Sequence, residues 1–172
     1  MDRNELITKL LALDDDASLL LSERIPMIII GGSALILGNH SKRSTQDIDV
    51  IDRYPELQSI LENYDVNNRS NAFADCLAEN FQDRLIKMDL QTKVIDYYLL
   101  SLEDLVIMKL YSDRPKDYDD ITNSDTIANL DWDKLDGIIE SGEADVSFNE
   151  KRYKRFLEKY EKYKSENKKW DK

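Results

Sequence analysis

The chain reads Ile30-Gly31-Gly32-Ser33-Ala34 and, a few residues later, Arg43-Ser44-Thr45-Gln46-Asp47-Ile48-Asp49-Val50. The apolar run at residues 27–30 stops at two glycines, which predicts a buried strand that enters a tight turn. Residues 33–37 predict a short helix after that turn. Residues 47–51 alternate acidic and aliphatic side chains, so we expect a second strand with one polar edge.

The acids of the second stretch, Asp47 and Asp49, are spaced so that both side chains leave the same face of a strand. Carboxylates this close repel each other unless a cation lies between them. Oxygen ligands of this kind suit Mg²⁺ or Mn²⁺. Two such metals about 3.5–4 Å apart can activate an attacking hydroxyl and hold a triphosphate. A solvated edge strand is the alternative interpretation, whereas a calcium loop is excluded because Ile51 and Asp52 replace its ligand and its glycine.

The glycine pair of the first stretch lets the backbone approach a ligand closely. Amides at the start of the following helix would face a phosphate, and the Ser33 hydroxyl would add one donor. A plain turn is the alternative interpretation. Each motif alone is weak evidence, but a glycine turn and an acid pair that both follow or occupy strands favour a site for a nucleotide and a metal.

Composition limits the class of protein further. The 172 residues predict one domain. The net charge of −11 makes a uniformly basic, nucleic-acid-binding body improbable on charge alone. The charge is uneven, because residues 149–172 carry ten bases against five acids (+5) and residues 1–148 carry 14 against 30 (−16). We expect a cytoplasmic protein without a membrane span, since no apolar run is long enough and one cysteine allows no internal disulfide.

The remaining pattern predicts mainly helices around these strands. Residues 84–90 and 93–100 predict a β-hairpin, and residues 101–112 predict a helix with a strong N-terminal cap. From residue 149 an aromatic stripe at helical spacing predicts a long helix that packs on the core. Further helices are expected at residues 4–22, 56–63 and 70–80 and from Pro115.

These residues resemble the signature of the nucleotidyltransferase superfamily: Gly31-Gly32-Ser33-Ala34, then Arg43-x-Thr45-x-Asp47-Ile48-Asp49. The sequence is most similar to the AbiEii-like and related small bacterial nucleotidyltransferases, several of which are toxins of toxin–antitoxin pairs. A second similar block reads Ser101-x-Glu103-Asp104-Leu105 through Lys109, then Arg114-Pro115-Lys116-Asp117-x-x-Asp120-Ile121. The resemblance covers residues 25–122.

The resemblance implies an α+β fold in which helices flank a small mixed sheet. We expect a single domain, 1–172, with a nucleotidyltransferase core at 1–122 and a helical C-terminal extension at 123–172. The implied catalytic residues are Asp47, Asp49, Lys109, Asp117 and Asp120. The implied nucleotide-binding residues are Gly31, Gly32, Ser33, Arg43, Thr45 and Lys109. The implied metal ligands are Asp47 and Asp49 with a third carboxylate, for which Asp96 is the first choice and Asp89 the second.

The implied activity is a Mg²⁺- or Mn²⁺-dependent transfer of a nucleoside monophosphate from an NTP to an acceptor hydroxyl, with release of pyrophosphate. The acceptor is left open between RNA, such as tRNA, a protein and a small molecule. A toxin role, with a cognate antitoxin as partner, is one form of this expectation. The alternative is a catalytically degenerate module of the same fold that binds a nucleotide or a protein.

Overall fold

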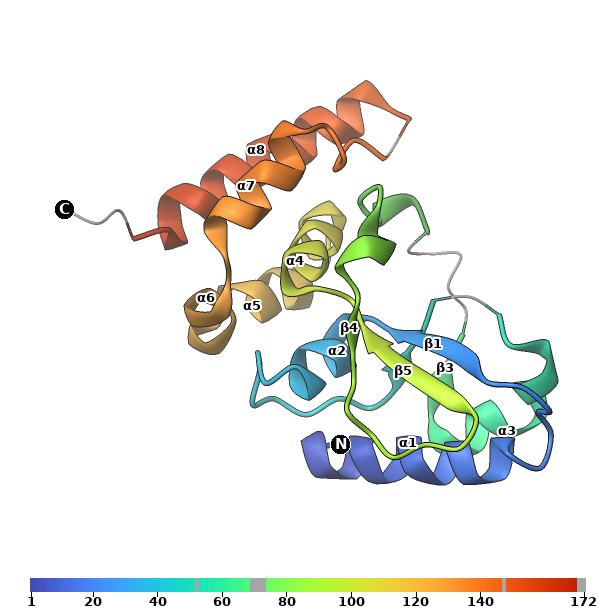
Figure 1. The fold of residues 1–172 in the computed structure, drawn as a ribbon. Helices are drawn as coiled ribbons and strands as arrows, with labels where there is room; N and C mark the ends of the chain where they lie inside the picture. Colours follow the sequence, from blue (N-terminus) through green and yellow to red (C-terminus); the bar gives the residue numbers. More distant parts are fainter. Residues whose placement is uncertain (52, 69–73, 147, 170–172) are drawn as a thin grey trace.

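A computed structural model describes residues 1–51, 53–68, 74–146 and 148–169 of the chain (Figure 1). Its strands are β1 (Ile25–Ile29), β2 (Ile48–Asp49), β3 (Val66–Asn67), β4 (Ile86–Lys87) and β5 (Ile95–Leu99). Its α-helices are α1 (Arg3–Ala17), α2 (Gly31–Leu37), α3 (Gln58–Leu61), α4 (Leu102–Tyr111), α5 (Pro115–Thr122), α6 (Ser124–Asn129), α7 (Trp132–Glu140) and α8 (Glu150–Asn167). Short 3₁₀ turns are η1 (Pro55–Leu57), η2 (Glu62–Tyr64), η4 (Ala74–Cys76) and η5 (Phe81–Arg84). The predicted α+β class, a small mixed sheet flanked by helices with a helical C-terminal part, is confirmed.

The sheet is mixed because β5 lies between a parallel and an antiparallel neighbour. β1 pairs with β5 in parallel, with Ile29 opposite Leu99, and β4 pairs with β5 antiparallel as the predicted hairpin. Alternate residues of β5 are buried, as expected for a strand with one face on the core. Figure 1 shows α1 on one side of this sheet and α4 on the other.

A second, two-stranded ribbon joins the end of β1 and places the acid pair. β2 and β3 are parallel, with Asp49 opposite Asn67. The Ile30 amide donates a hydrogen bond to the Asp49 carbonyl at 2.9 Å, and Ile29 forms an antiparallel bridge with Val50. The chain therefore turns from β1 into α2 directly beside Asp49.

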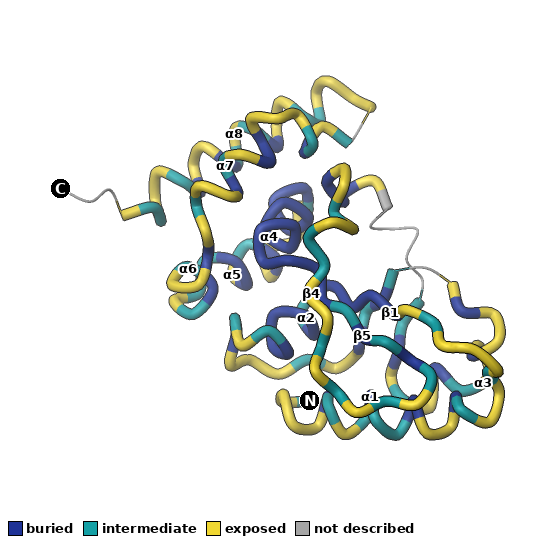
Figure 2. Tube along the Cα trace, viewed as in Figure 1, coloured by how far each residue is buried: buried dark blue, intermediate teal, exposed yellow. Residues whose placement is uncertain are grey.

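Helix α4 forms the centre of the structure, and all ten of its residues are buried (Figure 2). Its predicted N-terminal cap is confirmed, because the Ser101 hydroxyl accepts a hydrogen bond from the Asp104 amide at 3.1 Å. Asp104 is fully buried and forms a two-point ion pair with Arg84 at 2.8 and 2.9 Å. This charged pair fixes the start of α4 against the segment before β4.

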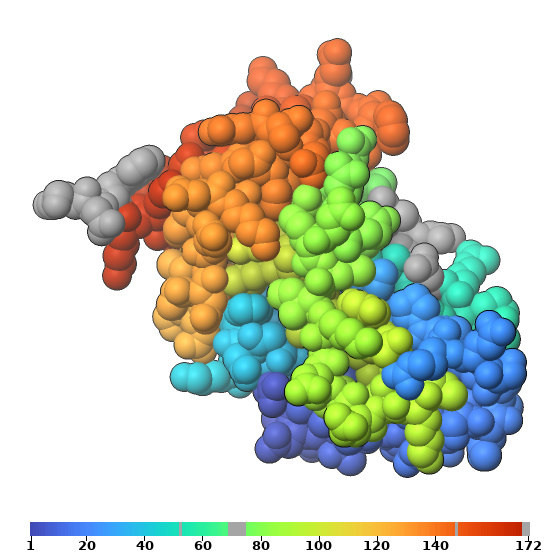
Figure 3. Space-filling view, in the orientation of Figure 1, coloured from blue at the N-terminus to red at the C-terminus, as the bar shows by residue number. Residues whose placement is uncertain are grey.

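The C-terminal helices pack on the far side of α4 from the sheet. Asn149 caps α8, and the aromatic stripe of α8 faces inward as predicted, with Phe156, Tyr160 and Tyr163 buried. Phe156 stacks on Tyr111 of α4 with ring centroids 4.3 Å apart. Figure 3 shows this orange and red segment seated directly on the rest of the molecule.

Three predicted helices differ in extent. The helix expected at 4–22 ends at Ala17, and the one expected at 56–63 is η1, α3 and η2 in succession. Of the helix expected at 70–80, residues 70–73 lie outside the described residues, and the rest holds only the single 3₁₀ turn η4. Asp14, three residues before the end of α1, connects this helix to the segment that enters β5. Its buried carboxylate accepts hydrogen bonds from the amides of Lys93, Val94 and Ile95 at 2.6–2.9 Å.

We expect Asp14→Ala to lower the free energy of unfolding by at least about 3 kcal/mol, because three amides at the start of β5 lose a charged acceptor. Urea denaturation provides the measurement. The matched control is Asp15→Ala, which removes an exposed carboxylate paired with Lys93 on the surface and should cost less than about 1 kcal/mol. Equal losses in the two variants would contradict this role for Asp14.

Candidate functional site

The predicted motifs meet in one cavity of about 670 Å³. Its walls come from the β1–α2 turn, the segment leading into β2, strand β3, and helices α4 and α5. Three further residues come from segments that sequence reasoning did not connect with the site, namely Cys76, Asn67 and Arg152 of α8. The predicted site residues that line it are Gly31, Gly32, Thr45, Asp47, Asp49, Lys109, Asp117 and Asp120.

The acid pair occupies one wall of this cavity. Asp47 is exposed, whereas Asp49 is half-buried and accepts a hydrogen bond from the Asn67 side-chain amide at 3.0 Å. Burial and the negative charge of Asp47 raise the pKa of Asp49 above its usual 3.8, and the Asn67 hydrogen bond opposes part of that increase. The two carboxylates therefore repel each other in the folded chain, which is the condition that a bound cation would relieve.

The glycine turn lies against this wall. Gly31 has φ of +66°, a left-handed conformation that favours glycine, and a Cβ placed on it would lie 3.0 Å from the Asp49 Oδ2 atom. A Cβ on Gly32 would lie 3.8 Å from the Thr45 hydroxyl oxygen. The backbone of the turn thus approaches the acid pair more closely than a side chain at Gly31 would allow.

Lys109 lies at the floor of the cavity inside a network of charges. Its Nζ atom contacts Asp117 at 2.8 Å and Asp120 at 2.9 Å, and all three side chains are buried. Arg43 reaches Asp120 from the segment before β2, at 3.0 Å, and Arg114 reaches Asp117 at 2.6 Å. The network therefore joins α4, α5 and the segment that carries the acid pair.

Ionised Asp117 is stabilised by this network. Burial acts to raise its pKa, but hydrogen bonds from Lys109 and Ser112 and the charge of Lys109 outweigh burial, so the pKa is lowered. The Ser112 hydroxyl donates its hydrogen bond to Asp117 at 2.6 Å. The positive charge of Lys109 is thus already shared between two carboxylates, and its clearest role in this geometry is to hold α5 against α4.

Four predicted site residues are not brought into the cavity wall. The Ser33 hydroxyl is buried and donates a hydrogen bond to the Ile30 carbonyl at 3.0 Å, and Arg43 contacts Asp120 from outside. Asp96 lies opposite Pro26, at the other end of β1 from Gly31, roughly 16 Å along the strand. It pairs there with Arg24 at 2.7 Å and Lys87 at 3.1 Å, which lower its pKa to about 2. Asp89, the second choice for a third carboxylate, is exposed outside the lining.

Two cations at the start of α5 complete the wall. Arg114 and Lys116 both line the cavity and are exposed. Both belong to the block Arg114-Pro115-Lys116-Asp117, which the sequence analysis had singled out. The sequence does not predict, however, that these two side chains line the same cavity as the acid pair. Arg152 follows more than 100 residues after Asp49, and its place in the wall depends on how α8 packs.

The donor set fits a hard divalent cation. Asp47 and Asp49 offer carboxylate oxygens only, and Mg²⁺ is commonly held by one or two carboxylates together with substrate phosphates. Within the described ranges, no group of three or more histidine, cysteine, aspartate or glutamate side chains is placed to hold a metal. A metal here would accordingly depend on the acid pair and on oxygens of a bound substrate.

A mixed sheet with a glycine turn beside paired acids, and with cations in the same cavity, is the arrangement expected for a nucleotidyltransferase. The comparison of sequences agrees, because the family described as Nucleotidyltransferase of unknown function (DUF6036) matches residues 8–168. The chain belongs to this family, which supports the superfamily identified from the motifs. No curated protein and no solved structure matches the chain. None of the described helices is both long and apolar enough to cross a membrane.

We expect Lys109→Met to lower the free energy of unfolding by about 3–5 kcal/mol, because it leaves two buried carboxylates without their shared cation. Chemical denaturation at pH 7 measures this loss. Lys116→Met, which removes an exposed lysine of the same cavity, serves as the control and should change stability by less than about 0.5 kcal/mol. A Lys109→Met variant as stable as the control would show that the network contributes little.

We expect Asp49→Asn to melt above the unmodified protein at pH 7 in the absence of divalent metal. The pKa of Asp49 is raised by folding, so its ionised form opposes folding; this cost is absent below its unfolded pKa and fully present above its folded pKa. The stabilisation by Asn should therefore fade as the pH is lowered toward 4. Asp119→Asn removes one exposed acid of α5 and is the control for net charge. Melting curves from pH 4 to 7 test this, and an Asp49→Asn variant that melts lower at pH 7 would refute the repulsion.

Proposed function

We propose that this protein is a metal-dependent nucleotidyltransferase that transfers a nucleoside monophosphate from an NTP to an acceptor hydroxyl. The observation that carries the proposal is that Asp47 and Asp49 share one cavity with the Gly31–Gly32 backbone and with three cationic side chains besides Lys109. Those cations are Arg114, Lys116 and Arg152. Such a cavity suits a substrate with several phosphates, because the acids can bind the phosphates through a metal cation while the basic side chains contact them directly.

Asp47 and Asp49 would hold Mg²⁺ or Mn²⁺ through their carboxylate oxygens. When bound, the cation would neutralise phosphate charge and increase the acidity of the attacking hydroxyl. Asn67 holds the Asp49 carboxylate in place at 3.0 Å, and the absent side chain of Gly31 leaves space directly beside that carboxylate. These residues therefore position the acids before any substrate arrives.

Arg114 and Lys116 would contact the triphosphate from the opposite wall. Arg114 uses its Nε atom on Asp117, which leaves further donors of the guanidinium for phosphate oxygens. Lys109 keeps α5, and hence both of these cations, in register with α4. We thus assign to Lys109, Asp117 and Asp120 the positioning of the phosphate-binding side chains.

The reaction balances as a substitution at phosphorus. The acceptor oxygen forms a bond with the α-phosphorus, while the bond from that phosphorus to the oxygen bridging the β-phosphate breaks. Pyrophosphate leaves with the bonding pair, and the hydroxyl proton passes to solvent. Side-chain donors aimed at the phosphate oxygens stabilise the charge that develops on them.

We further propose an acceptor class and a biological role. The resemblance to the AbiEii-like branch supports a toxin with an antitoxin partner, acting in the cytoplasm on RNA, on a protein or on a small molecule. ATP is one of the four NTPs to be tried. A nucleotide-binding module without turnover is the second candidate, favoured by the finding that no group of three or more histidine, cysteine, aspartate or glutamate side chains in the described part of the chain is placed to hold a metal.

The decisive experiment supplies each labelled NTP with Mg²⁺ or Mn²⁺ and cell extract, and then separates RNA, protein and small molecules. We expect label on one class, and at least about a hundredfold less with Asp47→Asn or Asp49→Asn, because each variant would lose a ligand of the cation that neutralises phosphate charge. Asp119→Asn, an exposed acid outside the cavity, should transfer normally. No label with any NTP, together with a melting temperature raised by an NTP, would favour the module without turnover.

A further inference from the structure

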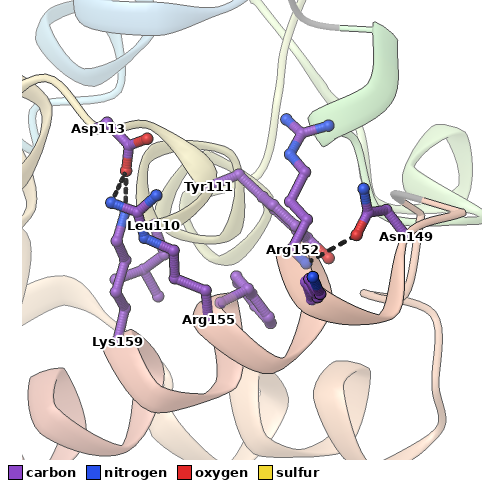
Figure 4. A pocket seen from close by; sticks show the side chains of 9 residues that line it. Leu110, Tyr111, Asp113, Asn149, Arg152, Arg155 and Lys159 are labelled. Carbon is purple, nitrogen blue, oxygen red and sulfur yellow. Dashed lines mark hydrogen bonds and ion pairs between the residues drawn. The ribbon is translucent and has the colours of Figure 1, made fainter.

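Two smaller hollows open beside the cavity, along the same side of α8. One of about 330 Å³ lies between α8 and the end of α4 (Figure 4) and shares Tyr111 and Arg152 with the cavity. The other, of about 270 Å³, shares Ser112 and Arg114 with the cavity. The three spaces therefore have wall residues in common and lie next to one another.

The hollows are lined by a row of cations. Residues 151, 152, 155, 159 and 162 recur at helical spacing, which places them along one flank of α8. Among the described residues that line the two hollows, Asp113 is the one acid. We call this row the α8 cationic face; it consists of Lys151, Arg152, Arg155, Lys159 and Lys162.

This face is distinct from the flank of α8 that is used for packing. On the opposite flank, Lys164 and Lys168 pair with Asp136 of α7 at 3.0 and 3.1 Å. On the cationic face, Asp75 pairs with Arg152, Asp113 with both Arg155 and Lys159, and Glu166 lies 3.9 Å from Lys162. Five cations therefore face three acids there, an excess of positive charge, whereas residues 1–148 carry a net charge of −16. Positive charge is thus concentrated beside the cavity in a chain that is otherwise strongly acidic.

Arg152 is fixed at the junction between the cationic face and the cavity. Its guanidinium contacts Asp75 at 2.6 Å and the Cys76 sulfur at 3.0 Å, and it lies over the Tyr111 ring at 5.2 Å from the centroid. Three contacts from two other segments hold it in one position. A phosphate that moves from the α8 cationic face into the cavity would pass this residue.

We infer that the α8 cationic face binds the phosphate chain of a single-stranded nucleic acid whose terminal hydroxyl enters the cavity as the acceptor. The inference rests on the proposed function, which requires a hydroxyl beside Asp47 and Asp49. A row of cations that leads to that point fits an acceptor with both a hydroxyl end and regularly spaced negative charges. A strand, rather than a duplex, can place one end inside a cavity of this size.

Asp113 supplies an internal test of this inference. Its carboxylate bridges Arg155 at 2.9 Å and Lys159 at 2.8 Å, as Figure 4 shows, and it is exposed. A strand phosphate would take over these two cations. Asp113 therefore competes with the nucleic acid, and its removal should strengthen binding.

The experiment is fluorescence anisotropy of a labelled 12-nucleotide strand at about 0.1 M salt, without NTP, with RNA and DNA of one sequence as separate arms. Each phosphate contact with a single strand contributes about 0.7 to the salt slope, or roughly fivefold in affinity at this salt. We expect the double variant Arg155→Gln/Lys159→Gln to bind about 25-fold more weakly, with a salt slope smaller by about 1.4. Asp113→Asn should bind about fivefold more tightly.

The matched control removes the same charge elsewhere. Lys154→Gln/Lys169→Gln alters two exposed lysines outside both hollows and should change affinity by less than about threefold. Equal weakening by both double variants would overturn the inference, as would the absence of binding. So would a decaglutamate peptide that binds as tightly as the strands, because the face would then suit an acidic protein.

The binding measurement separates this inference from the proposed function. Strand binding that depends on the α8 cationic face, without transfer from any NTP, would support the surface and overturn the chemistry. Transfer to a protein or small molecule, with no strand binding, would support the chemistry and overturn the surface. Transfer to a strand that weakens in Arg155→Gln/Lys159→Gln would support both.

Discussion

The buried ammonium group of Lys109, held between Asp117 and Asp120, is the contact on which the site depends. It connects the central helix α4 to α5, and Asp120 passes the connection on to Arg43, just before the acid pair. Breaking such a buried network leaves charges without partners, which is far more costly than losing a surface ion pair. The geometry of both cavity walls is consequently set by one set of ion pairs and does not need a bound substrate to form.

The opposite wall has the reverse property, because folding brings like charges together there. Asp49 is half-buried beside Asp47, and burial and that neighbour both disfavour its ionised form. A bound cation would relieve this repulsion, and the free energy so released would contribute to its binding. The two walls therefore differ in function: one stabilises the arrangement of the helices, and the other holds an unfavourable interaction that a cation would remove.

The sequence predicted those features of the fold that depend only on residues close together in the chain. The glycine turn, the acid spacing, the Ser101 cap and the hairpin between β4 and β5 were predictable because each depends on neighbouring residues. Asp96, the first choice for a third carboxylate, lies outside the cavity wall because its pairing opposite Pro26 places it at the other end of the strand from Gly31. Strand alternation predicts the face on which a residue lies but not its position along the neighbouring strand. Arg152 could not be predicted, since its position depends on the packing of Phe156 against Tyr111.

The C-terminal helix α8 is part of the candidate site because its packing positions a residue that lines the cavity. One face of α8 buries Phe156, Tyr160 and Tyr163, which fixes the rotation of the helix about its axis. Because the side chains of a helix are rigidly spaced, that rotation also fixes where the α8 cationic face points. The contacts that stabilise α8 are thus the same contacts that aim Arg152 into the cavity and align its neighbours along the hollows. A change in the aromatic stripe would alter the cationic face without touching a single charge.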